Sequence, residues 1–152
     1  SLFAAATKVG SILSKKENKT KEALEFYGKN LGLTFQIADD ALDYNSELKL
    51  FGKEIGNDFY EGKITLPIIL LYQKANQDEK KKIKQYFEKK DRSENDFNHV
   101  LILIKKYSII NECYRKAEHF INLASSSLSI FKETKEKEIL KNLTSFSLER
   151  SF

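Results

Sequence analysis

Residues 20–44 read TKEALEFYGKNLGLTFQIADDALDY and set the expectation for the whole fold. Apolar residues recur along this stretch with a period near 3.6, which predicts one long amphipathic helix. Gly28 and Gly32 stand one turn apart inside it. Because each glycine costs about 1 kcal/mol relative to alanine in a helix, we expect another helix to approach closely there. The stripe expected to be buried consists of Ala23, Phe26, Tyr27, Leu31, Phe35, Ala38 and Leu42.

The rest of the chain shows the same helical pattern, and no strand pattern competes with it. Another helix should begin after Thr65 as its N-cap, with Pro67 in the first turn. One proline and six glycines leave little turn material for an all-β fold. We therefore predict an all-α chain that forms a single domain over residues 1–152. Further helices are expected over residues 2–14, 78–89, 95–105, 108–132 and 136–149.

Composition narrows the class of protein. Hydrophobic residues make up 41% of the 152 residues and charged residues 32%, which is typical of a globular chain. Cys113 is the single cysteine, so no internal disulfide can form and a reducing, cytoplasmic location is expected. No apolar run approaches the roughly 20 residues that span a bilayer, so we expect no integral membrane segment.

Three aspartates lie within one turn near the end of the long helix. Asp39 and Asp43 are separated by about 6 Å along a helix axis and share a face, which Asp40 flanks. Carboxylates in this arrangement suit a hard cation such as Mg²⁺, whose remaining ligands are water and substrate phosphates. The alternative is a solvated acidic face, the more frequent meaning of so short a motif.

A glycine-rich segment of weak periodicity follows, over residues 45–63, and could contain a short helical turn. Lys53 and Lys63 each come directly after a glycine, which would let the backbone approach a ligand closely. Lysine is a mobile point charge for phosphate, so lysines beside a carboxylate-bound Mg²⁺ would make a diphosphate site. A solvated loop with ordinary turn glycines is the alternative.

Two long stretches resemble a known family. YGKNLGLTFQIADDALDY and GKEIGNDFYEGKITLPIILL resemble the second half of the trans-isoprenyl (polyprenyl) diphosphate synthases. The opening LFAAAT and the ending SLERSF are also similar to family segments, so the resemblance spans essentially the whole chain. The matching positions are Tyr27, Gly28, Leu31, Gly32, Phe35, Gln36, Asp39, Asp40, Asp43, Gly52, Lys53, Gly56, Asp58, Gly62, Lys63, Thr65, Leu66 and Pro67.

The resemblance implies the C-terminal portion of an antiparallel all-α barrel of the isoprenoid synthase type. It also implies that the full-length enzyme is a homodimer, as family members usually are. Its implied substrates are an allylic diphosphate and isopentenyl diphosphate, joined after Mg²⁺-assisted ionisation. Asp58 would orient a lysine or a metal-bound water. The implied assignments are Asp39, Asp40 and Asp43 as metal ligands, Asp39, Asp40 and Lys53 as catalytic residues, and Phe35, Gln36, Lys53 and Lys63 as substrate-binding residues.

The family's first aspartate-rich motif has no counterpart in this sequence. We therefore expect an N-terminal part to be missing and these 152 residues alone to be inactive. An alternative is a non-catalytic subunit, or an interaction fragment that completes or regulates a prenyl synthase barrel. Lysine-rich residues 79–90 and 132–141 could suggest nucleic-acid binding. Acidic residues interleave with those lysines, which indicates solvated helix faces, so no nucleic-acid partner is expected.

Overall fold

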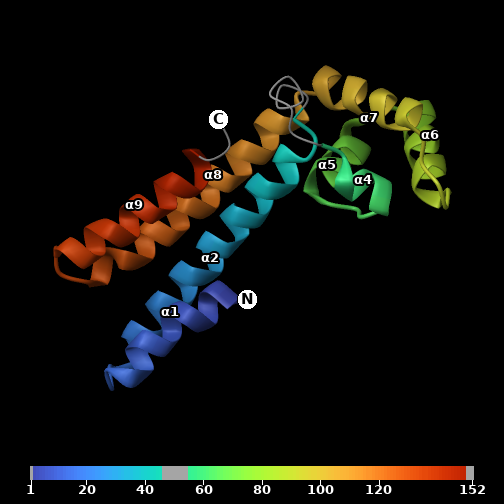
Figure 1. The fold of residues 1–152 in the computed structure, drawn as a ribbon. Coiled ribbons are helices and arrows are strands. Elements are labelled where there is room, and N and C mark those ends of the chain that lie inside the picture. The colour runs from blue at the N-terminus through green and yellow to red at the C-terminus, as the bar shows by residue number, and fades with distance from the viewer. Residues whose placement is uncertain (1, 46–54, 150–152) are drawn as a thin grey trace. The chain divides into compact units, whose positions relative to one another are not determined.

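The computed structural model describes residues 2–45 and 55–149, and every regular element in those ranges is helical. This confirms the predicted all-α class (Figure 1). The chain divides into two compact units, Ser1–Ala38 with Arg115–Phe152, and Asp39–Tyr114. The helices α2 (Asn18–Leu42) and α8 (Ile109–Ser127) each contain residues of both units. The expected single domain stays a prediction.

The first unit is built from helices laid side by side. In Figure 1, α1 (Leu2–Leu13) lies along α2, and α9 (Lys135–Glu149) lies along α8. A 3₁₀ turn, Leu128–Ile130, follows α8. The core cluster of this unit comprises Tyr27, Leu31, Ala124 and Leu128, with Phe3, Leu24, Phe131 and Leu140 packed against it.

The two glycines inside α2 mark the contact with α1. A Cβ at Gly28 would collide with the side chain of Thr7 and the backbone of Phe3. At Gly32 it would come within 3.2 Å of the Phe3 ring. The Thr7 hydroxyl donates to the carbonyl of Leu24 at 2.6 Å, which only a close backbone approach permits. The predicted helix–helix contact at these glycines is thereby confirmed.

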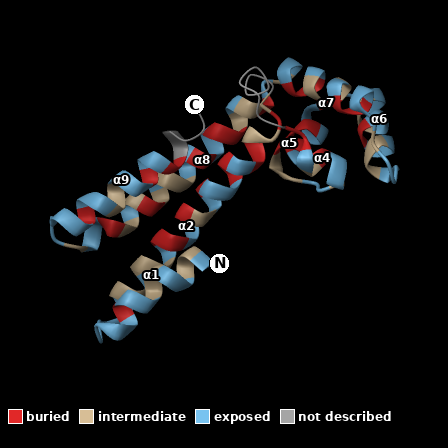
Figure 2. Ribbon diagram, in the orientation of Figure 1, coloured by how far each residue is buried: buried red, intermediate tan, exposed pale blue. Residues whose placement is uncertain are grey.

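The buried face of α2 differs from the predicted stripe. Tyr27, Leu31 and Ala38 are buried as expected, but Phe26 is 46% exposed and Phe35 is 36% exposed. Figure 2 shows buried and exposed residues alternating along α2. Polar residues take part in the buried face instead, since the Thr34 hydroxyl donates to the carbonyl of Ala117 on α8 at 3.3 Å. A short polar side chain that bonds a backbone carbonyl can be buried at little cost, so apolar spacing alone misplaced part of the face.

The second unit consists of short helices with well-defined starts. They are α4 (Asn57–Glu61), α5 (Leu66–Lys74), α6 (Gln77–Glu88) and α7 (Glu94–Lys106). Capping boxes start α6 at Asn76 and α7 at Ser93. Thr65 precedes α5, with a proline in the first turn, as predicted. The short helix α4 confirms the helical turn expected in the glycine-rich segment.

An aromatic cluster forms the core around α4. The fully buried Phe59 ring lies with its centroid 5.4 Å from that of Phe97 and 5.5 Å from that of Phe87. Tyr44 joins the cluster through Phe97, at a centroid distance of 6.1 Å. This packing fixes α4 and the residues that flank it.

Over the described ranges, we find no helix whose length and apolarity would let it cross a bilayer.

Candidate functional site: the acidic end of α2 and the α4 segment

The three aspartates have different surroundings, although all belong to the second unit. Asp39 is exposed, whereas Asp40 is only 8% exposed. Asp43 follows the last residue of α2 and is partly buried. Because their exposures differ, position in the sequence alone does not give the three carboxylates the same role.

The carboxylate of Asp43 binds the start of α4. Its Oδ1 accepts the backbone N–H groups of Gly56 and Asn57, both at 3.1 Å, and its Oδ2 accepts that of Asp58 at 2.9 Å. The N-cap residue Gly56 has no side chain with which to cap the helix. Asp43 thus satisfies N–H groups that a short helix leaves without intrahelical partners.

Negative charge is concentrated around Asp43. Burial raises the pKa of the Asp43 carboxyl, and the charge of Asp58 raises it further, although the hydrogen bonds from the backbone lower it. Burial also raises the pKa of the adjacent Tyr44 hydroxyl well above its ordinary value, with contributions from the charges of Asp43 and Asp58. Burial is the largest cause of both shifts, and the charge of the neighbouring carboxylates adds to it.

Lys63 is paired with Asp58, one member of this acidic group. Its Nζ lies 2.6 Å from Glu61 and 3.3 Å from Asp58, and its backbone N–H donates to the carbonyl of Asp58 at 2.8 Å. The side chain is 57% exposed. The hydrogen bond to Glu61 raises the pKa of Lys63 most, and the one to Asp58 raises it further, so Lys63 carries its charge at neutral pH.

Arg92 supports the Lys63 segment from the turn between α6 and α7. Its guanidinium donates to the carbonyl of Tyr60 at 3.2 Å and to that of Phe87 at 3.0 Å. Gly62 ends α4 with φ of 75°, and a Cβ there would lie 2.5 Å from Nη2 of Arg92. Gly62 is therefore required by the backbone turn and by Arg92. The sequence contained no periodicity or motif that pointed to Arg92.

Two of the predicted substrate-binding residues lie earlier on α2. Phe35 and Gln36 belong to the first unit, as residues of α2. The Phe35 ring contacts Phe3, with 5.7 Å between centroids. Lys53 lies outside the described residues, so its role stays a prediction. Hydrogen bonds and an ion pair join Asp43, Asp58 and Lys63. Asp43 in turn follows Asp39 and Asp40 closely in sequence.

The carboxylate oxygens of this segment are the kind of ligand that Mg²⁺ prefers. Mg²⁺ is usually held by one or two carboxylates together with substrate phosphates, and Asp39 and Asp40 supply that number of carboxylates. In the described ranges, 2–45 and 55–149, no group of three or more His, Cys, Asp or Glu side chains is arranged to hold an ion. A two-carboxylate arrangement completed by phosphate oxygens fits both observations.

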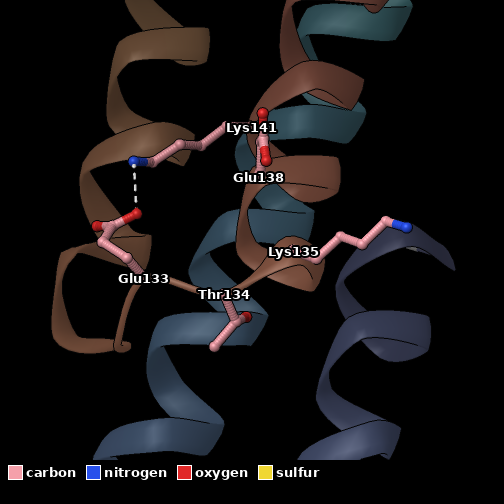
Figure 3. A pocket seen from close by; sticks show the side chains of 5 residues that line it. All are labelled: Glu133, Thr134, Lys135, Glu138 and Lys141. Carbon is pink, nitrogen blue, oxygen red and sulfur yellow. Dashed lines mark ion pairs between the residues drawn. The ribbon is translucent and has the colours of Figure 1, made fainter.

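A pocket of about 360 Å³ lies in the first unit, away from these residues in sequence. Figure 3 shows Lys141 and Glu133 pointing toward each other, with 3.6 Å between their charged atoms. A hydrogen bond from Lys137 lowers the pKa of Glu133. The lining charges are thus of both signs and include neutralised pairs, so this hollow does not suit a diphosphate. It is lined by Glu133, Thr134, Lys135, Glu138 and Lys141.

Comparison with known proteins gives a consistent result. The family described as polyprenyl synthetase matches residues 1–104. The short chain isoprenyl diphosphate synthase of Methanothermobacter thermautotrophicus is 31% identical over 149 residues, which are 98% of this chain and 45% of that protein. The chain therefore spans about half the length of the curated relatives it matches.

Solved structures show the same fold. A decaprenyl diphosphate synthase from Rhodobacter capsulatus is similar with a TM-score of 0.91 at 32% identity, over 99% of this chain and 46% of that one. A polyprenyl synthase from Caulobacter crescentus, complexed with calcium and isoprenyl diphosphate, gives 0.88 at 34% identity over 99% and 46%. The predicted isoprenoid synthase type of all-α fold is confirmed, for about half of that fold.

Proposed function

The chain belongs to the polyprenyl synthetase family, and we propose that it supplies the second aspartate-rich motif and the diphosphate-binding lysines of a trans-prenyltransferase. The reaction would join an allylic diphosphate to isopentenyl diphosphate. One observation carries this proposal: the contacts from Asp43 to Asp58 and from Asp58 to Lys63 connect the acidic end of α2 to a charged lysine. The residues proposed to bind a divalent cation and those proposed to bind the diphosphate thus belong to one compact unit.

We assign the metal-binding role to the carboxylates of Asp39 and Asp40. Mg²⁺ held there would stabilise the negative charge that develops on the departing diphosphate. Asp43 is the third predicted ligand. Since a carboxylate has about four lone-pair sites, three N–H groups leave it one at most for a metal or a metal-bound water.

Lys63 would bind the diphosphate directly. Its side chain is 57% exposed and now pairs with Glu61, which is itself 59% exposed, and with Asp58. A pair between two exposed groups, such as Lys63 with Glu61, contributes little free energy. A diphosphate oxygen can therefore replace Glu61 at small cost, while Asp58 keeps its contacts with Lys63. The charge on Lys63 is stationary while the leaving group becomes more negative, so the interaction strengthens as the reaction proceeds.

The remaining roles follow from the resemblance. Lys53 would be the second diphosphate-binding lysine and a catalytic residue beside Asp39 and Asp40. Phe35 and Gln36 would bind substrate near the reacting carbons. The cytoplasmic location and the homodimer of the complete enzyme stay predictions, as does the absence of a nucleic-acid partner.

Calorimetric titration with geranyl diphosphate tests the proposal. We expect binding that requires Mg²⁺ and that weakens at least about tenfold in an Asp39→Ala/Asp40→Ala variant, since the charge-assisted contacts to the ion are lost. Asp91→Asn, which changes an exposed carboxylate on the α6–α7 turn, should bind like the wild type. Equal binding without Mg²⁺, or no effect of the double substitution, would contradict the assignment.

The same samples test the expectation that these 152 residues alone are inactive. With labelled isopentenyl diphosphate and geranyl diphosphate as substrates, we expect no longer prenyl product to accumulate. Product formation that Asp39→Ala/Asp40→Ala abolishes would overturn that expectation, although it would strengthen the assignment of the reaction.

A further inference from the structure

Asp43 has a set of contacts that a metal ligand does not need. Its two oxygens accept three backbone N–H groups, from Gly56, Asn57 and Asp58. The N–H of Gly56 also donates to the backbone carbonyl of Asp43 at 2.8 Å. The residue therefore binds the start of α4 with its main chain as well as its side chain, across 13 to 15 residues of sequence.

The contacts continue from Asp58 to Lys63. The backbone carbonyl of Asp58 accepts the N–H of Lys63 at 2.8 Å, and its carboxylate lies 3.3 Å from the Lys63 ammonium. Fixing the N–H of Asp58 thus fixes the residue that holds Lys63 at both its main chain and its side chain. The path from Asp43 to Lys63 therefore runs through Asp58.

The packing around α4 gives this path a defined geometry. Gly56 has φ of 90°, and its Cα faces the Phe97 ring so closely that a Cβ would lie 2.5 Å from the ring. Only glycine is comfortable in such a conformation, and it has no side chain that could cap α4. The cap must come from elsewhere in the chain, and Asp43 provides it.

We propose that Asp43 is a positioning residue, which holds α4 so that Asp58 presents Lys63 to the diphosphate, rather than a direct metal ligand. This assignment rests on the proposed function and deepens it. It divides the three aspartates by role: Asp39 and Asp40 bind the cation, and Asp43 acts on the anion through Lys63. The resemblance had grouped all three as metal ligands.

Amide hydrogen exchange tests the first half of the proposal without metal or substrate. In Asp43→Ala, the amides of Asn57, Asp58 and Lys63 should exchange at least about tenfold faster than in the wild type, whereas Gly56 keeps its bond to the Asp43 carbonyl. Asp39→Ala should leave those rates unchanged. Asp43→Asn, which keeps one acceptor oxygen, should give an intermediate increase and guards against a misfolded alanine variant. Unchanged exchange in both Asp43 variants would overturn the proposal.

A thermodynamic cycle with pyrophosphate as the probe, at saturating Mg²⁺, tests the second half. Asp43→Asn should weaken pyrophosphate binding by about tenfold in the wild type and by less than about twofold when Lys63→Ala is already present. The midpoint of a Mg²⁺ titration should shift in Asp39→Asn but not in Asp43→Asn. Equal losses in both backgrounds, or a Mg²⁺ shift in Asp43→Asn that matches Asp39→Asn, would overturn the positioning role.

The two proposals fail in different ways. If the wild type binds no pyrophosphate at any Mg²⁺ concentration while Asp43→Ala still accelerates amide exchange, the proposed function is wrong and the contact with α4 is confirmed. If pyrophosphate binds and requires Mg²⁺ but amide exchange is unaffected in both Asp43 variants, the proposed function stands and the positioning role is wrong.

Discussion

Lys106 at the end of α7 donates a hydrogen bond to Glu79 in the first turn of α6, at 2.7 Å. The Tyr107 hydroxyl donates to the other oxygen of the same carboxylate, also at 2.7 Å. Glu79 in addition accepts the backbone N–H of Asn76 at 2.9 Å and so completes the capping box of α6. One carboxylate therefore connects the start of one helix to the end of another.

This connection predicts a pH-dependent contribution to stability. Hydrogen bonds from Lys106, Tyr107 and the Asn76 backbone lower the pKa of Glu79 from 4.5 to about 2. A carboxyl whose pKa is lower in the folded state stabilises that state above its unfolded pKa. The contribution of Glu79 should be complete above pH 4.5 and should disappear as the pH falls toward about 2.

Urea unfolding of Glu79→Gln at a series of pH values measures this effect. The urea midpoint of the variant should lie below that of the wild type at pH 7, and the gap should narrow below about pH 4.5. Glu118→Gln, at an exposed position on α8, is the matched control and should show no such narrowing. A gap that is constant with pH would show that Glu79 acts through packing instead of charge.

Two glycines should respond to alanine with opposite signs. Gly56→Ala places a Cβ at φ of 90° and against the Phe97 ring, so the free energy of unfolding should fall by about 2 kcal/mol or more. Gly10→Ala lies inside α1 with no atom near the added Cβ, and it should raise that free energy by about 0.5–1 kcal/mol. Thermal unfolding followed by circular dichroism gives both signs; a tolerated Gly56→Ala would contradict the described turn.

Tyr27 should contribute through its hydroxyl as well as its ring. The ring is fully buried, and the hydroxyl donates to the carbonyl of Leu140 on α9 at 2.8 Å. Tyr27→Phe leaves that carbonyl without its donor, so the free energy of unfolding should fall by about 1–2 kcal/mol. Tyr72→Phe, at a 43% exposed position, should change it by less than about 0.5 kcal/mol. Equal urea midpoints for the two variants would show that the hydroxyl contact adds nothing.

The sequence by itself determined the helices and the family, because both depend on residues near one another in the chain. Helical periodicity located the elements, and the start of α5 after Thr65 and the close approach at Gly28 and Gly32 were predicted correctly, although the Thr65 side chain makes no capping hydrogen bond. The composite motif identified the family, since it is read from consecutive residues. Each of these inferences needs only local geometry and side-chain type.

Only the tertiary structure decided which face of α2 is buried and what Asp43 binds. Burial of Thr34 depends on a carbonyl 83 residues away in sequence, and the cap that Asp43 gives α4 depends on the chain returning after 13 to 15 residues. Arg92 reaches Tyr60 across 32 residues. Spacing cannot predict such contacts, because the partner is chosen by packing around Phe59 and Phe97 and by the need of buried polar groups for hydrogen bonds.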